Sequence, residues 1–226
     1  MLSFHNEQKI KDKYVARVIA HRKADNLIQG TGWKDGKGCA VGCTLEKYDH
    51  KAYEDELGIP EWLAKVEDTL FEGMSKEDAI GWPEDFLKAI PVGVDLEQVK
   101  ASFLIFILQT ALDTFDHEKF PDCKKSIDRV IDLYSSGETD LDNFHAARAA
   151  AAFAADATAA FAANAAFAAD AADAAFAARA AAYAADAAYA AYATYAAARA
   201  AYAAYAAGGE YKKFANKLIE IMGDLK

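Results

Sequence analysis

One segment, residues 146–207, restricts the fold of this chain more than any other. Alanine fills 42 of its 62 positions, and neither Gly nor Pro interrupts it. Alanine loses no side-chain rotamer entropy when it enters a helix and has the highest helix propensity of all residues. The segment is therefore predicted to be helical, and its alanine faces allow neighbouring backbones to approach closely.

The residues other than alanine in this segment recur mostly at every third position. On a helix of 3.6 residues per turn each such step advances about 300°, so the row winds slowly around the helix. Over residues 148–176 this arrangement places the Phe side chains on one face and the charged side chains on the other. Beyond Arg179 the register changes, and a single rod would be about 93 Å long. At least one break in the helix is therefore expected.

The remaining sequence also favours helices, because its four Pro residues occur only at positions 60, 83, 91 and 121. The first helix is predicted to begin at Ser3 or Asn6 and to end near Gln29, with Gly30 as its stop. Further helices are predicted over about residues 39–48, 51–57, 60–73, 84–89, 96–115, 121–134 and 211–222, with one candidate hairpin around 33–37. The chain is thus predicted to be all-α. A helical globular region, residues 1–145, is expected to pack as one unit with an alanine-rich helical region, residues 146–226.

Charge and composition exclude several functional classes. The net charge of −10 is uneven, since residues 1–50 sum to +3 and residues 51–145 to −13. The acidic middle third disfavours binding to a nucleic-acid backbone. The longest apolar run, residues 101–112, is too short to span a bilayer, and an odd count of three Cys suits a reducing cytoplasm. We therefore expect a cytoplasmic protein without a membrane or nucleic-acid partner and without a cofactor.

The glycine-rich segment 30–38 and its neighbours form the best candidate for catalysis. Cys39 follows this segment at a predicted helix N-terminus, where unpaired N–H groups lower the pKa of a thiol. His21 and Asp25 lie four residues apart on one helix face and could act as a base and the group that orients it. With loop amides as oxyanion donors, these residues suggest a Cys-His-Asp arrangement, although their spacing matches no cysteine-hydrolase signature.

The same loop could instead bind a small anion. Its candidate binding residues are Lys34, Gly36, Lys37 and Gly38, but the segment lacks the residue order of a nucleotide-binding P-loop.

A metal site could use Cys39, Cys43 and His50, with His21 or Cys123 as the fourth ligand. Structural zinc sites use shorter paired spacings, so no metal site is predicted.

The second half of the alanine-rich segment is rich in Tyr and poor in charge. Such a surface is typical of protein interfaces, where Tyr is enriched. The candidate partner-binding residues are Tyr189, Tyr192, Tyr195, Tyr202 and Tyr205. Alanine-rich helices also occur in ice-binding proteins, but here only Thr158 and Thr194 could supply the regularly spaced hydroxyl-methyl groups.

Three segments carry a resemblance to a known group of proteins: Gly36–Thr44, which contains GKGCAVGC, Glu56–Leu63 and Phe86–Asp95. Together with the alanine-rich tail, they resemble a family of bacteriophage and prophage proteins. The tail alone is also similar to tails in some bacterial toxin-immunity proteins. The family resemblance implies a phage or mobile-element setting and brings no catalytic residue.

These observations lead to two functional hypotheses. The first is a non-enzymatic interaction protein, such as a phage accessory or counter-defence factor that binds and blocks or sequesters a host component in the host cytoplasm. The alternative is a binder of a small anionic ligand or nucleotide, or a cysteine-dependent enzyme, that uses the 30–43 loop with His21 and Asp25.

Overall fold

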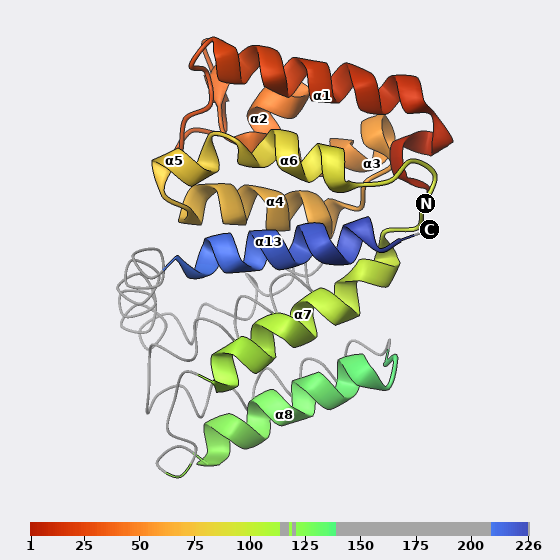
Figure 1. Cartoon of the computed structure of the whole chain (residues 1–226), viewed down its shortest axis with the longest axis vertical. Coiled ribbons are helices and arrows are strands. Elements are labelled where there is room, and N and C mark those ends of the chain that lie inside the picture. Colours follow the sequence, from red (N-terminus) through yellow and green to blue (C-terminus); the bar gives the residue numbers. More distant parts are fainter. Residues whose placement is uncertain (114–117, 119–120, 139–208, 226) are drawn as a thin grey trace, which may run out of the picture. The chain divides into compact units, whose positions relative to one another are not determined.

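A computed structural model describes residues 1–113, 118, 121–138 and 209–225 (Figure 1). Within these residues the chain forms nine α-helices, one short 3-10 helix and one two-stranded hairpin, which confirms the predicted all-α class. None of the helices in this part of the chain combines the length and apolar character that a membrane span needs.

The chain divides into two compact units. Residues 1–100 with 206–226 form the first unit, and residues 101–205 form the second. This division joins the C-terminal helix to the first hundred residues. The predicted boundary between the helical globular region and the alanine-rich region falls at residue 146. That position and the candidate partner-binding tyrosines lie outside the described residues.

The first unit contains most of the described secondary structure. Its elements are the 3-10 helix η1 (Ser3–Asn6), α1 (Gln8–Lys23), β1 (Trp33–Lys34), β2 (Lys37–Gly38), α2 (Ala40–Leu45), α3 (Ala52–Leu57), α4 (Glu61–Gly73), α5 (Lys76–Ala79), α6 (Trp82–Ala89) and α13 (Glu210–Gly223). The predicted helices over 51–57, 60–73, 84–89 and 211–222 are confirmed to within about two residues. Local signals fix several helix ends. Gly58 takes the left-handed conformation and ends α3, and the Ser75 hydroxyl caps the start of α5 by accepting a hydrogen bond from the Asp78 amide.

The predicted end of the first helix is wrong. Helix α1 ends at Lys23 instead of near Gln29, because Asp25 adopts a left-handed φ of 52°. The following residues run beside the hairpin, where Gly38 donates to the Asn26 carbonyl at 3.0 Å and Ile28 donates to the Gly38 carbonyl at 2.9 Å. Pairing with a distant strand therefore replaces the last turns of the predicted helix.

The predicted N-terminal cap is also wrong. Glu7, not Ser3 or Asn6, precedes α1, and it provides no side-chain cap. The fully buried Ser3 instead joins the N-terminus to residues 91–94: its hydroxyl donates to the Pro91 carbonyl at 2.5 Å and accepts from the Val94 amide at 3.0 Å.

The core of the first unit lies among α1, α2, α4, α6 and α13. Helix α1 packs on α2 and α6, and α4 packs on α2, α6 and α13 (Figure 1). Its largest buried apolar side chains include Tyr14, Val18, Leu63, Leu70, Phe71, Phe86, Leu87, Phe214, Leu218 and Met222. Helices α4 and α13 approach closely, because a Cβ atom added at Gly73 would lie 2.5 Å from the Tyr211 ring. The C-terminal helix is thus an integral part of this core.

Two further helices belong wholly or partly to the second unit. Helix α7 (Glu97–Leu112) begins in the first unit and continues into the second, and α8 (Pro121–Ser135) follows it. The predicted apolar centre of α7 is buried at Phe103, Leu104, Ile107 and Leu108, while Ile105 and Phe106 are only half-buried. On α8 the buried positions 127, 130 and 134 repeat with helical spacing.

Candidate functional site

The predicted hairpin is present and leads directly into Cys39. Strands β1 and β2 are antiparallel, with Trp33 opposite Gly38. The turn between them is Asp35–Gly36, whose φ angles of 52° and 77° are both left-handed, as a two-residue hairpin turn requires. The glycine-rich segment therefore forms a tight hairpin against the start of α2.

Three glycines hold this hairpin against the helix. A Cβ atom at Gly38 or Gly42 would lie 2.2 Å or 1.8 Å from the Gly32 carbonyl oxygen. A Cβ atom at Gly32 itself would lie 2.5 Å from the Tyr48 ring. The glycine content of the segment is thus explained by close packing of backbone against backbone and ring.

The amide groups near the proposed anion site are bonded within the protein. Gly38 donates to Asn26, and the Cys39 amide donates to the carbonyls of Thr31 at 2.7 Å and Gly32 at 3.1 Å. Lys34 and Lys37 face each other across the hairpin and are exposed, as is Gly36 in the turn. The hairpin therefore does not direct the amides of Gly38 and Cys39 toward a bound anion or an oxyanion.

The structure does not pair His21 with Asp25. The His21 ring packs edge-on against Trp33, with ring centroids 5.4 Å apart, and its Nε2 lies 3.6 Å from a carboxylate oxygen of Glu46. Asp25 is exposed in the turn after α1 and, within the described residues, forms no hydrogen bond or ion pair with His21. His21 and Asp25 therefore do not form the predicted pair of a base and its orienting carboxylate.

Cys39 is a buried thiol with an unfavourable environment for a thiolate. Its side chain is 1% exposed, and its Sγ lies 3.5 Å from the Gly32 carbonyl oxygen. Burial raises the pKa of Cys39 well above the usual thiol value, and the nearby carboxylate of Asp68 raises it further. The helix that follows Cys39 is only six residues long, so its dipole offers little compensation. Cys39 therefore lacks the lowered pKa that a catalytic nucleophile needs.

Cys43, which was considered as a metal ligand beside Cys39, has different neighbours. Its Sγ lies 3.4 Å from the Gly38 carbonyl oxygen and 3.5 Å from that of Asn26. Burial raises the pKa of Cys43 to about 12. The third cysteine, Cys123, lies on α8 in the second unit.

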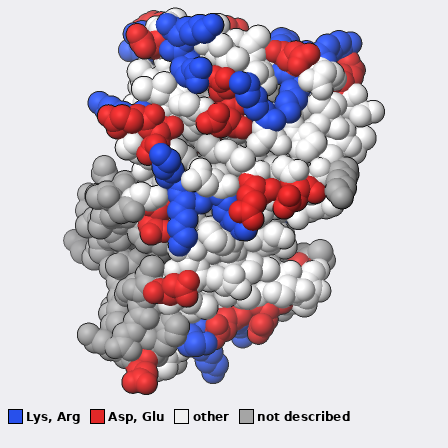
Figure 2. Space-filling model, in the orientation of Figure 1, with Lys and Arg blue, Asp and Glu red and all other residues white. Residues whose placement is uncertain are grey.

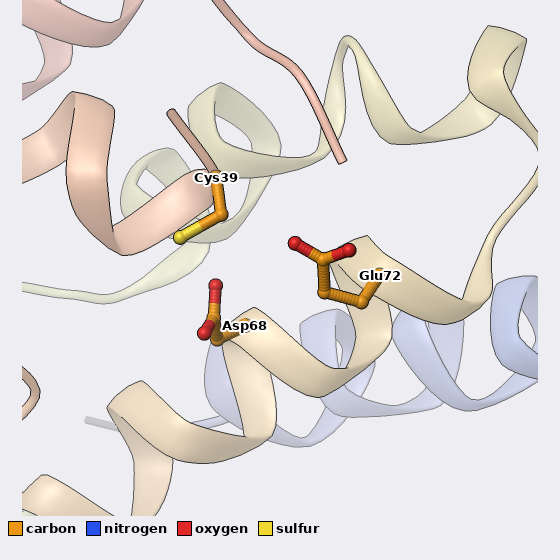
Figure 3. A group of neighbouring side chains, drawn as sticks. All are labelled: Cys39, Asp68 and Glu72. Atoms are coloured by element: carbon orange, nitrogen blue, oxygen red, sulfur yellow. The ribbon is translucent and has the colours of Figure 1, made fainter. Parts of the chain in front are cut away.

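Cys39 does lie next to two carboxylates, Asp68 and Glu72, that are not among the predicted site residues. Asp68 and Glu72, one turn apart on α4, rise from that helix toward Cys39 at the start of α2 (Figure 3). One ligand atom from each of the three residues lies within 4.8 Å of the others. Their spacing of four residues was visible in the sequence, but such pairs are common in its acidic middle third.

Asp68 is held by two residues of the segment before α3. The Tyr48 hydroxyl donates to Asp68 Oδ2 at 3.2 Å, and His50 Nε2 lies 3.1 Å from the same oxygen. Glu72 is held in a comparable way, because Gly30 N–H donates to its Oε2 at 2.7 Å. Burial raises the pKa of Glu72, and the charge of Asp68 adds to this effect. The hairpin, α2 and α4 thus meet at one polar cluster inside the first unit.

The charged surface around this unit is mixed. Figure 2 shows acidic and basic side chains interspersed over the face in view, without one large patch of a single sign.

Comparisons of the chain with protein-family models, with curated proteins and with solved structures gave no match.

Proposed function

We propose that this protein is a non-enzymatic interaction protein that uses its tyrosine-rich segment to bind a protein partner. One observation carries the proposal: Tyr189, Tyr192, Tyr195, Tyr202 and Tyr205 recur among alanines with few charges between them. Tyr provides a large, rigid ring and a hydroxyl at low entropic cost, which is why protein interfaces are enriched in it. Alanine between the rings permits close approach of a partner's backbone.

The geometry of the 30–43 loop gives the enzymatic alternative less support. A cysteine enzyme would need an accessible thiolate, a base beside it and free oxyanion donors. Here Cys39 is buried with a raised pKa, His21 and Asp25 are not paired, and the Gly38 amide is bonded within the fold. These observations favour a binding role over covalent catalysis.

The proposed partner is a host component that the protein blocks or sequesters in the host cytoplasm. The resemblance of the GKGCAVGC segment and the alanine-rich tail to bacteriophage and prophage proteins supports this setting. Nucleic acid is a less suitable partner, because the chain carries a net charge of −10.

Affinity capture with matched variants tests the proposal. The full chain would be expressed in its native host as wild type, with the five tyrosines replaced by Ala, and with the same five replaced by Phe. The wild type should retain a reproducible protein partner, the Ala variant should lose at least about 90% of it, and the Phe variant should keep most of it because the rings remain. Circular dichroism controls for the helix content of each variant. No reproducible partner, or equal recovery with the Ala variant, would contradict the proposal.

A further inference from the structure

We propose that Cys39, Asp68 and Glu72 bind a divalent transition-metal ion of the zinc type. The proposal is independent of the interaction function, since it rests only on the first unit. The three side chains converge from two elements, with Cys39 directly before α2 and both carboxylates on α4 (Figure 3). Their ligand atoms lie within 4.8 Å of one another. This places one thiol and two carboxylates around a common point.

A second observation concerns one oxygen of the Asp68 carboxylate. Asp68 is only 7% exposed, and its Oδ1 atom is buried without a hydrogen-bond partner among the described residues. Its other oxygen, Oδ2, is held by Tyr48 and His50. A buried carboxylate oxygen without a partner is costly, and native proteins rarely leave one. A cation coordinated by Oδ1 of Asp68 would satisfy this oxygen.

The other polar contacts prepare the carboxylates as ligands. Tyr48 and His50 fix one oxygen of Asp68, and the Gly30 amide fixes one oxygen of Glu72, so each carboxylate keeps an oxygen that these donors do not occupy. Hydrogen bonds of this kind orient the side chains that bind the metal in known sites and contribute to metal affinity. His50, which the sequence suggested as a direct ligand, instead supports Asp68.

The ligand set favours zinc-like ions over magnesium or calcium. Zn²⁺ accepts Cys sulfur at about 2.3 Å and carboxylate oxygen at about 2.0–2.2 Å, so tetrahedral ligands lie roughly 3.4–3.6 Å apart. From separations of up to 4.8 Å the three ligand atoms would have to approach one another by up to about 1.3 Å. Glu72, which is exposed and held only through one oxygen by the Gly30 amide, is the ligand best placed to move. Magnesium and calcium prefer six or more oxygen ligands and avoid thiolates. The exposed side at Glu72 would leave room for a water as the fourth ligand.

Binding requires the Cys39 thiol to lose its proton, which the cation itself drives. On binding, the S–H bond breaks, a metal–sulfur bond forms and the proton passes to solvent. Two carboxylates and one thiolate then surround a doubly positive ion, whose charge offsets both the burial and the repulsion from Asp68 that disfavour the thiolate in the metal-free site.

Cobalt titration of the full chain tests this proposal, because Co²⁺ occupies zinc sites and a Co²⁺–thiolate bond gives a charge-transfer absorption. Chelator-treated protein would be titrated with Co²⁺ alone, and bound Co²⁺ would then be displaced with Zn²⁺. Wild type should bind one ion per chain with the thiolate absorption, and excess Mg²⁺ should not remove it.

Variants distinguish the proposed ligands from the rest of the cluster. Cys39→Ser should abolish the thiolate absorption, and Glu72→Gln and Asp68→Asn should each weaken Co²⁺ binding by at least about tenfold. Cys43→Ser is the matched control: this second buried cysteine, four residues away, should leave the absorption unchanged. Circular dichroism checks the fold, and Glu72→Gln remains informative if the buried substitutions unfold the chain, because Glu72 is exposed.

Two results would overturn the proposal. The first is wild-type protein that binds neither Co²⁺ nor Zn²⁺ stoichiometrically, which would leave the cluster as a buried thiol beside carboxylates only. The second is a thiolate absorption that persists in Cys39→Ser or disappears in Cys43→Ser, which would assign the sulfur ligand elsewhere.

Discussion

Replacing Gly42 with Ala should destabilise the first unit through a single steric contact. The added Cβ atom would lie 1.8 Å from the Gly32 carbonyl oxygen and 2.9 Å from its carbon, both of them backbone atoms. Restoring an acceptable separation of about 3.0 Å requires the hairpin to move by roughly 1.2 Å relative to α2. That movement also strains the hydrogen bond from the Cys39 amide to the same carbonyl, which is 3.1 Å long.

The magnitude follows from these two effects. Overpacking costs about 1–3 kcal/mol and loss of the hydrogen bond about 1 kcal/mol, while the higher helix propensity of Ala returns up to about 1 kcal/mol. A net loss of about 1–3 kcal/mol is expected, which at a typical urea m-value of about 2 kcal/mol/M lowers the unfolding midpoint by roughly 0.5–1.5 M.

Tryptophan fluorescence measures this loss in the appropriate unit, because all three Trp residues, at positions 33, 62 and 82, belong to the first unit. Gly81→Ala is the matched control. Its Cβ would meet only Asp85 Oδ2 at 3.6 Å, so the free energy of unfolding should change by less than about 0.5 kcal/mol. A Gly42→Ala midpoint equal to that of wild type would refute the packing account of the glycine-rich segment.

Three further predictions concern other contacts in the same unit. Ser3→Ala leaves a buried backbone N–H without its acceptor and should cost about 1–3 kcal/mol in urea unfolding, whereas an unchanged midpoint would show that Ser3 does not anchor the N-terminus. Partial burial alone would raise the pKa of Glu56, but hydrogen bonds from Tyr14 and Lys47 lower this pKa below its usual 4.5. The stability that the Glu56 carboxylate contributes is therefore present above pH 4.5 and is lost as the pH falls further. Wild type should therefore lose more stability than Glu56→Gln between about pH 5 and pH 3, and parallel curves would contradict this. The Cys39 thiol should react with a disulfide reagent at pH 8 at least about tenfold more slowly in the native chain than in urea, and a fast native reaction would restore the nucleophile hypothesis.

Much of the fold could be predicted because its signals are local. Pro60 and Gly58 mark the junction of α3 and α4, and the helical spacing of apolar residues identifies the buried faces. The end of α1 could not be predicted in this way. Asp25 and Asn26 are compatible with a helix, and they leave it only because the chain beyond them pairs with Gly38, a contact that depends on the hairpin.

The candidate site shows the same limit more clearly. The sequence drew attention to Cys39 and paired it with His21 and Asp25, residues chosen because they lie one turn apart on a predicted helix. The actual carboxylate neighbours, Asp68 and Glu72, lie about 30 residues further along on a different helix. Spacing along a helix reveals which residues share a face, but it does not reveal which other helix that face will meet.

Native mass spectrometry of the full chain purified from its native host tests the central proposal most directly, because it reads the partner and its stoichiometry in one measurement. We expect a complex of defined mass for the wild type and for the variant with the five tyrosines replaced by Phe, and the free chain for the variant with the same residues replaced by Ala. A wild-type chain that is found alone, or an Ala variant that keeps the same complex, would contradict it.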